Sequence, residues 1–260
     1  MNAPLRSAWL GAALVVAATA AHAGRSCEQQ RPQAAKVVQA MTLAEHVKAQ
    51  LDATGAQVVV LARVGQDLSK YGQRYSHMGL AYRDGTTWRV AHKLNECGTA
   101  HAAVFRQGLG EFFLDDLFDF QAGIAVLAPS VQAKLLPALR DNASLARLNT
   151  PAYSMVAYPW AQTYQQSNQW ALETMAMTQD PYATTRAGAQ SWLRAQGYQP
   201  TTLHLSAFER LGARMTAANV AFDDHPNGKR FTDRIETMTV DSAFSWLQRS
   251  GLATAVLTVR

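Results

Sequence analysis

Several features that would mark common classes of protein are missing from this chain. It has no cluster of Lys and Arg, so its formal charge of +5 does not indicate a nucleic-acid partner. After the first 23 residues no stretch approaches the roughly 20 apolar residues that a membrane-spanning helix needs. There is no internal repeat, low-complexity tract or long linker. These absences leave one α+β domain as the expected organisation, and the length suits a single sizeable core.

The N-terminus has the three parts of a secretory signal. Arg6 supplies the positive region, residues 8–20 are apolar, and Ala21-His22-Ala23 is a cleavage motif. We therefore expect residues 1–23 to be removed and an exported, periplasmic or secreted domain to span 24–260. A C-terminal extension is expected from about residue 198.

Only two cysteines occur, Cys27 and Cys97. Both lie in the part expected to be exported, and an even count in an oxidising compartment favours a Cys27–Cys97 disulfide. The alternative is that Cys97 is a free nucleophile with His101 four residues further on, although an exported free thiol is exposed to oxidation.

Hydrophobic periodicity predicts helices and strands throughout the chain. The region 98–121 is expected to be a covering loop with a short helix, rich in Phe, that either packs in the core or lines an apolar groove. A helix with Pro137 inside it is expected to kink or break there. The expected helices are 35–53, 131–148, 162–177, 187–196, 206–218 and 242–248, and the expected strands are 57–64, 75–83, 87–94, 123–128, 235–240 and 253–259.

Two predicted neighbouring strands each carry a histidine. His77 lies in the strand 75–83, the segment 83–86 reads as a tight turn, and His92 lies in the strand that follows. Two histidines on adjacent strands can be a catalytic pair, half of a metal site or ordinary half-buried side chains. The residue types alone leave these alternatives open.

Ser167 falls where a later helix could begin. A nucleophile at a helix N-terminus gains from the positive end of the helix dipole. Serine is also a preferred helix cap, which needs no function. Trp170, three residues on, is expected to point inward.

This order of features resembles the circularly permuted branch of the papain-like NlpC/P60 superfamily over roughly residues 57–178. The resemblance implies an antiparallel sheet packed against helices, with His77 as general base and His92 as its orienting partner. The nucleophile position, usually Cys, falls on Ser167 of Ser167-Asn168-Gln169-Trp170. Tyr75 and Trp170 would then contact the substrate. No metal or other cofactor is implied.

The whole chain also resembles an uncharacterised bacterial secreted family, domain of unknown function 2145. The segments 222–226 and 239–247 carry this resemblance, which implies no activity. Asp223, Asp224 and His225 could ligate a divalent metal, but adjacent residues rarely all face one ion, and the segment equally suits a hydrogen-bonded turn.

Two main functions are compatible with these patterns. The first is an exported papain-like hydrolase of peptide or cell-wall amide bonds in which Ser167 attacks. The second is an inactive relative that binds a cell-envelope ligand or protein in the same groove, because serine must lose its proton during attack whereas a paired cysteine is partly thiolate. A thiol enzyme using Cys97 is a third option.

Overall fold

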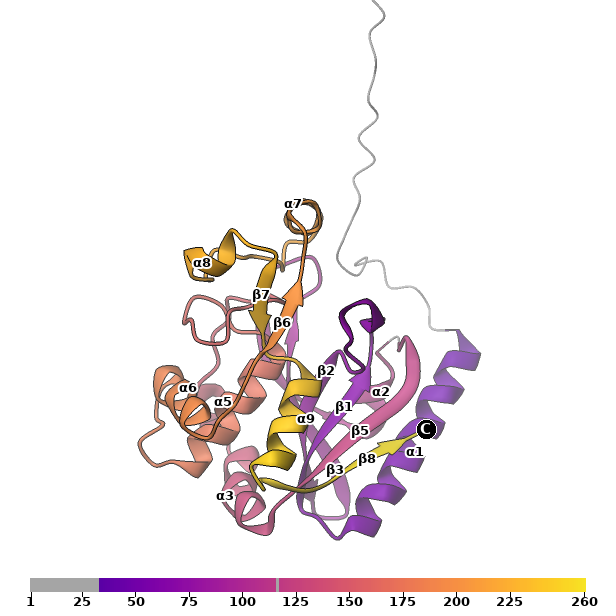
Figure 1. Cartoon of the computed structure of the whole chain (residues 1–260). Coiled ribbons are helices and arrows are strands. Elements are labelled where there is room, and N and C mark those ends of the chain that lie inside the picture. Colours follow the sequence, from indigo (N-terminus) through magenta and orange to yellow (C-terminus); the bar gives the residue numbers. More distant parts are fainter. Residues whose placement is uncertain (1–32, 116) are drawn as a thin grey trace, which may run out of the picture.

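The structure is a computed structural model and describes residues 33–115 and 117–260. In this part of the chain an antiparallel six-stranded sheet lies between two layers of helices (Figure 1). The predicted class, α+β with an antiparallel sheet packed against helices, is confirmed. The strands in spatial order are β4 (Ala102–Gly108), β3 (Thr87–Asn95), β2 (His77–Asp84), β1 (Val58–Val64), β5 (Asp119–Leu127) and β8 (Ala253–Val259).

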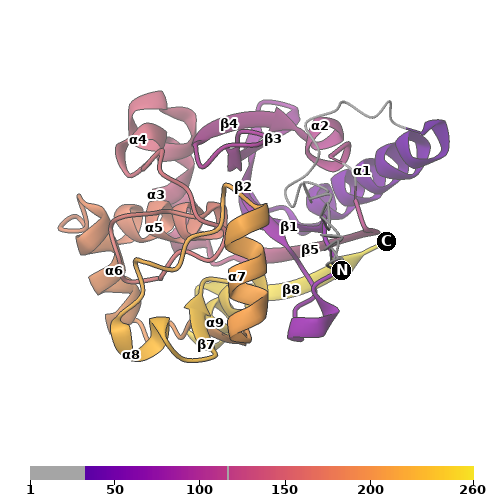
Figure 2. The same ribbon diagram turned by 90° about the horizontal axis from the view of Figure 1, so that it is seen from above.

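One face of the sheet is covered by α1 (Ala34–Thr54) and the short α2 (Leu109–Phe113), as the view from above also shows (Figure 2). Helix α1 buries Leu43, Val47 and Leu51, which recur at helical spacing. The Phe112 and Phe113 side chains are fully buried in this layer, so the core-packing interpretation of these two residues is confirmed.

The opposite face is covered by a larger group of helices, and the main core lies between them and the sheet. The helices of this layer are α3 (Pro129–Arg140), α4 (Asn142–Arg147), α5 (Ser167–Gln179), α6 (Arg186–Ala195) and α9 (Val240–Arg249). Strand β1 is buried along its whole length because it has a covered face on each side.

A small second sheet lies at one end of the molecule. It pairs β6 (Thr201–His204) with β7 (Arg234–Thr237), and α7 (Ala207–Thr216) and α8 (Asn227–Arg230) lie in the connection between these strands. Its own apolar cluster is Leu205, Phe222 and Ile235. The chain then returns through α9 to β8, which pairs with β5 in the main sheet.

Three expectations about the elements were wrong. Residues 102–108 form β4 at the edge of the main sheet, where a loop was expected. The helix that contains Pro137 continues through it and ends at Arg140, and α4 begins at Asn142. Residues 162–166 are not helical, so α5 begins at Ser167.

Candidate functional site

The β2–β3 hairpin brings the two predicted histidines together. His77 is the first residue of β2, and His92 lies in β3, which pairs with β2. Both rings lie on the α2 side of the sheet, with their centroids 6.0 and 5.2 Å from that of Phe112. Leu80 pairs with Ala91, so the neighbouring Gly79 lies next to His92, and a Cβ atom built on Gly79 would lie 2.9 Å from the His92 Cβ. Glycine at this position therefore makes room for the histidine beside it.

A chain of hydrogen bonds joins Ser167 to both histidines and continues beyond them. Ser167 Oγ lies 3.3 Å from His77 Nδ1, and His77 Nε2 lies 2.8 Å from His92 Nδ1. His92 Nε2 lies 2.7 Å from Gln107 Oε1, and Gln107 Nε2 donates to Glu111 Oε1 at 3.1 Å. The structure thus brings together the three residues predicted to be catalytic, and it adds two that the sequence analysis missed.

The far end of this chain sets the tautomers of both imidazoles. A carboxylate only accepts hydrogen bonds, so the Gln107 amide group faces Glu111 and its carbonyl oxygen faces His92. His92 must then carry its proton on Nε2, which leaves Nδ1 as an acceptor for His77 Nε2–H. In the neutral His77 the lone pair is consequently on Nδ1, the atom that faces the Ser167 hydroxyl.

The surroundings of His92 favour its uncharged form. It is completely buried, and this burial, together with the nearby positive charge of Arg63, lowers the pKa of His92 from 6.5 to about 3; the Gln107 hydrogen bond opposes the shift. Arg63 is held in place by the Phe112 carbonyl oxygen and by Asp115. At neutral pH His92 therefore accepts a hydrogen bond from His77 without competing for a proton.

Helix α5 places Ser167 at the end of the hairpin. The first helical residue is Ser167, and the capping position belongs to Gln166, whose side chain makes no capping bond. The interpretation of Ser167 as the helix cap is therefore wrong. Asn168 fixes the helix start against β2, because its side-chain oxygen accepts a hydrogen bond from the Met78 backbone N–H at 3.1 Å.

Ser167 itself is almost enclosed, with 6% of its surface exposed, whereas His77 is partly exposed. Tyr153 is also buried, and its hydroxyl lies beside Ser167. Burial raises the pKa of Tyr153, so its hydroxyl keeps its proton and can donate to the serine oxygen. No sequence pattern indicated Tyr153, because it comes from the loop between α4 and α5.

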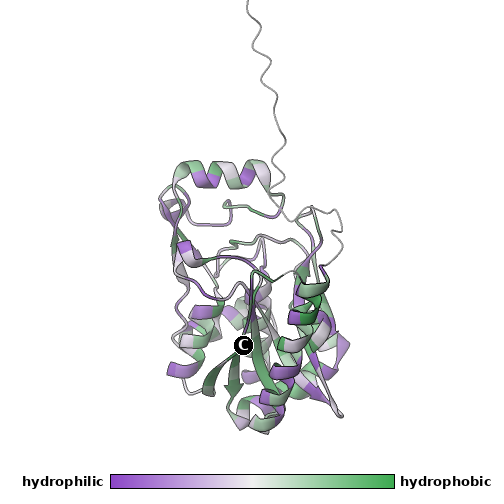
Figure 3. Cartoon of the chain, turned by 90° about the vertical axis from the view of Figure 1, so that its right-hand side faces the viewer, coloured by the Kyte–Doolittle hydropathy of each residue, from purple (hydrophilic) through white to green (hydrophobic). Residues whose placement is uncertain are grey.

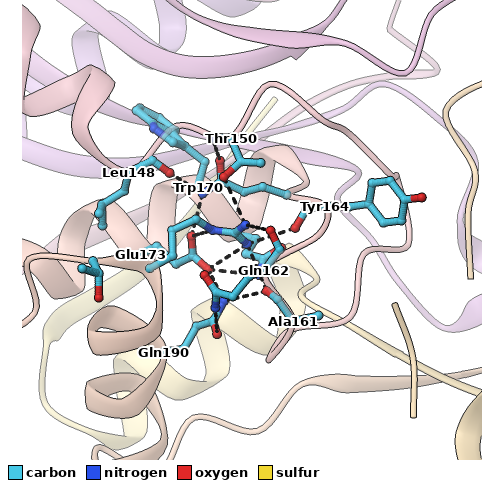
Figure 4. A network of polar contacts seen from close by, with 12 residues as sticks. Leu148, Thr150, Ala161, Gln162, Tyr164, Trp170, Glu173 and Gln190 are labelled. Carbon is cyan, nitrogen blue, oxygen red and sulfur yellow. Dashed lines mark hydrogen bonds and ion pairs between the residues drawn. The ribbon is translucent and has the colours of Figure 1, made fainter. Parts of the chain in front are cut away.

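A buried polar network holds the loop that leads into α5 (Figure 4). At its centre Arg186 Nε donates to Glu173 Oε2 at 2.8 Å, and both side chains are enclosed. The same guanidinium donates to three carbonyl oxygens of the loop, those of Ala161, Gln162 and Tyr164. Because the buried charges are paired and hydrogen-bonded, the network fixes the backbone just before Ser167.

Lys93 joins this network from the sheet. Its ammonium group is completely buried and donates to the Thr150 carbonyl and to Gln165 Oε1. Burial, together with the charge of Arg186, lowers the pKa of Lys93 to about 7, and Glu173 opposes the shift. The side chains of these adjacent β3 residues therefore point to opposite faces of the sheet, since His92 faces α2 and Lys93 faces the loop before α5.

The residues predicted to bind substrate lie in the core. Trp170 is completely buried and donates to the Leu145 carbonyl, while Tyr75 is 5% exposed and packs on Phe244. A separate groove of about 380 Å³ lies between β4 and α4, and neither histidine nor Ser167 lines it.

The acidic segment near residue 224 forms a hydrogen-bonded turn, as one of the two interpretations predicted. The buried His225 contacts Asp224 Oδ1 through Nδ1 at 2.9 Å and the Glu236 carbonyl through Nε2 at 3.0 Å. Asp223 points elsewhere and accepts from Tyr164. Within residues 33–115 and 117–260, no group of three or more His, Cys, Asp or Glu side chains is placed to hold a metal ion.

Some predictions concern residues that the structure does not describe. The signal segment 1–23 and Cys27 lie outside the described residues, so the cleavage site and the Cys27–Cys97 disulfide stay predictions. Cys97 is in an exposed turn after β3, and the described chain contains no free cysteine. The option of a free Cys97 nucleophile therefore has no support. No helix within the described ranges is long and apolar enough to cross a bilayer.

Fold and site together define an α+β protein in which a helix-borne serine meets two strand-borne histidines. A family model described as an uncharacterized protein conserved in bacteria (DUF2145) matches residues 50–247. The chain belongs to this family, as its sequence suggested. No curated protein and no solved structure matches. The resemblance to the NlpC/P60 superfamily stays a prediction.

Proposed function

We propose that this protein is an exported hydrolase of peptide or cell-wall amide bonds, in which Ser167 is the nucleophile and His77 the general base. The observation that carries the proposal is the 3.3 Å contact between Ser167 Oγ and His77 Nδ1, in a hydrogen-bond chain that leaves Nδ1 basic. This distance is slightly longer than an ideal hydrogen bond, as is common in sites without substrate.

The reaction follows from the positions of these atoms. His77 Nδ1 takes the Ser167 proton as Oγ attacks the carbonyl carbon, which forms a tetrahedral intermediate. The protonated imidazole then gives this proton to the departing amine nitrogen, and the C–N bond breaks to leave an acyl-serine. A water molecule, deprotonated by His77, attacks the acyl carbon, and Ser167 recovers its proton as the acid product leaves.

Two groups suit the negative charge that develops on the carbonyl oxygen. The first backbone N–H groups of α5 have no partners within the helix, and they lie at the positive end of its dipole. Tyr153 supplies a protonated hydroxyl next to Ser167. Donors of this kind contribute most when they are fixed before the reaction begins, and the network around Glu173 and Arg186 provides that rigidity.

His92, Gln107 and Glu111 have positioning roles in this scheme. When His77 is protonated during the reaction, its Nε2–H still donates to the neutral His92. The imidazolium is therefore held in one orientation, although its positive charge is not neutralised. This arrangement keeps Nδ1 of His77 directed at Ser167 throughout the reaction.

The order of the elements supports a permuted papain-like core. A histidine strand, an adjacent strand with the orienting histidine and a later helix that begins at the nucleophile occur in that sequence along β2, β3 and α5. The signal pattern in residues 1–23 supports export, and a cell-envelope amide is a substrate available in that location.

The alternative is a binding protein that keeps the fold without catalysis. It is favoured by serine at the expected cysteine position and by the 6% exposure of Ser167, because a substrate must displace neighbouring groups to reach Oγ. In that case the surface beside the partly exposed His77 holds a cell-envelope ligand intact.

Incubation with peptide-bearing cell-wall fragments, followed by mass spectrometry, distinguishes these functions. Hydrolysis by the wild-type chain that disappears in Ser167→Ala supports the enzyme. A matched control is Ser206→Ala, since Ser206 also lies at a helix N-terminus but has no histidine among its bonding partners. Fragments that bind equally to wild type and Ser167→Ala and are never cleaved would contradict the enzyme and support the binding protein.

A further inference from the structure

Helix α7 presents an apolar stripe to solvent at one end of the molecule. Phe208, Leu211 and Met215 are 87%, 57% and 77% exposed, and no residue of the helix is buried. Their spacing of three and four residues places them on one helix face. Figure 3 shows α7 at the outer end, beyond the small sheet, with apolar positions along it. A contiguous exposed surface of this kind marks an interaction site more often than chance.

Polar contacts hold this helix in place and leave the stripe uncovered. Ser206 and Glu209 form a capping box at its start. Glu209 also pairs with Lys70, and Arg210 donates to the Arg230 carbonyl oxygen at the end of α8. The helix is thus anchored through the residues beside and behind its stripe.

Another exposed apolar side chain and several arginines lie in the same part of the molecule, where Arg210 of α7 contacts Arg230 of α8. Phe231, which follows α8 directly, is 72% exposed. Arg214, Arg230 and Arg234 belong to the same region and form no ion pair in the described part of the chain. Most acidic side chains of this region contact a Lys or His side chain instead of these arginines. The pairs are Lys70–Glu209, His204–Asp233, His225–Asp224 and Lys229–Glu236.

We propose that α7 and Phe231 dock onto the surface of an anionic lipid bilayer. Short amphipathic helices with exposed Phe, Leu and Met on one side and Arg beside them lie in the interface with the apolar face among the acyl chains. Guanidinium groups such as that of Arg214 then meet the lipid phosphates. A second copy of the chain suits this surface less well, because it would bring the same arginines face to face.

Docking would also orient the candidate site. Strand β7 contacts the start of α5, where Gln166 donates to Thr237, so the α7 end of the molecule adjoins Ser167. The bilayer inference does not depend on catalysis and stands whether the site cleaves or only binds its ligand.

Vesicle flotation with the full chain tests this inference. The vesicles are phosphatidylcholine alone or phosphatidylcholine mixed with phosphatidylglycerol. We expect binding to the anionic vesicles only, weakened roughly fivefold by Arg214→Gln and further by added salt. Phe208→Ser together with Met215→Ser should weaken it at least roughly tenfold. Both positions are exposed, so the fold should be unaffected, which circular dichroism checks.

Tyr182→Ser is the matched control, because Tyr182 is 88% exposed but lies in the α5–α6 connection. Its binding should equal that of the wild type. Absence of binding to either vesicle, or equal binding by the Phe208→Ser/Met215→Ser variant, would overturn the inference. Self-association in analytical ultracentrifugation that this variant abolishes would also overturn it, in favour of a second copy.

Discussion

Acidification tests the interpretation of His92 as a permanently neutral imidazole. The perturbation is a change from pH 7 to pH 5, applied to the wild-type chain and to His92→Asn. The pKa of His92 is lowered from 6.5 to about 3 in the folded state. Between these values the unfolded chain binds a proton at His92 that the folded chain does not. The contribution of a neutral His92 to the free energy of unfolding is therefore fully present above pH 6.5 and is lost as the pH falls toward about 3.

The magnitude follows from the width of that interval. The free energy of unfolding falls by about 1.4 kcal/mol for each pH unit below 6.5. Between pH 6.5 and pH 5 the contribution of His92 therefore falls by about 2 kcal/mol. Asparagine keeps an acceptor for His77 Nε2–H but cannot titrate. The substitution also loses packing and the Gln107 hydrogen bond, which lowers the free energy of unfolding of His92→Asn by the same amount at both pH values. This loss therefore cancels when the change between pH 7 and pH 5 is compared in the two proteins.

Urea unfolding at both pH values measures this difference. The wild type should lose about 2 kcal/mol more than His92→Asn between pH 7 and pH 5. Equal losses in the two proteins would refute the assignment of a neutral His92 and, with it, the derived tautomer of His77.

Three further predictions concern the surroundings of the site. Gly79→Ala should destabilise the fold by about 1–3 kcal/mol and displace His92, because the new Cβ would overlap neighbouring atoms of β3; Gly108→Ala, with open space around it, should be tolerated in the same thermal melts. Glu173→Gln should cost about 3–5 kcal/mol in urea unfolding, since it leaves the Arg186 charge buried without its partner. The free energy of unfolding should rise from pH 7 to pH 10, because folding lowers the Lys93 pKa to about 7 and the unfolded chain keeps its proton to about 10.5; in Lys93→Met this rise should be smaller.

The local elements were largely predictable from the sequence. Alternation and apolar runs located β1, β2, β3 and β5, and the turn at Asp84-Gly85 fixed the hairpin that joins the histidine strands. The pairing of His77 and His92 followed from that hairpin. The contact of His77 with Ser167, ninety residues away, came only from the family resemblance.

Other features could not be predicted because they depend on tertiary packing. Residues 102–108 lack the clean alternation of a strand and become β4 through pairing with β3. That pairing also places Gln107 beside His92. Because β4 was not predicted from the sequence, Gln107 could not be predicted as the residue that orients His92. Tyr153 and Lys93 act through burial, which no local pattern indicates.

The most direct test of the central claim is labelling with a fluorophosphonate probe, followed by peptide mapping. The account predicts a covalent adduct on Ser167, absent in Ser167→Ala and formed at least 100-fold more slowly in His77→Ala, since serine without its base is a weak nucleophile. An adduct at any other serine, or no adduct in the correctly folded wild-type chain, would contradict the proposal that Ser167 and His77 form a catalytic pair.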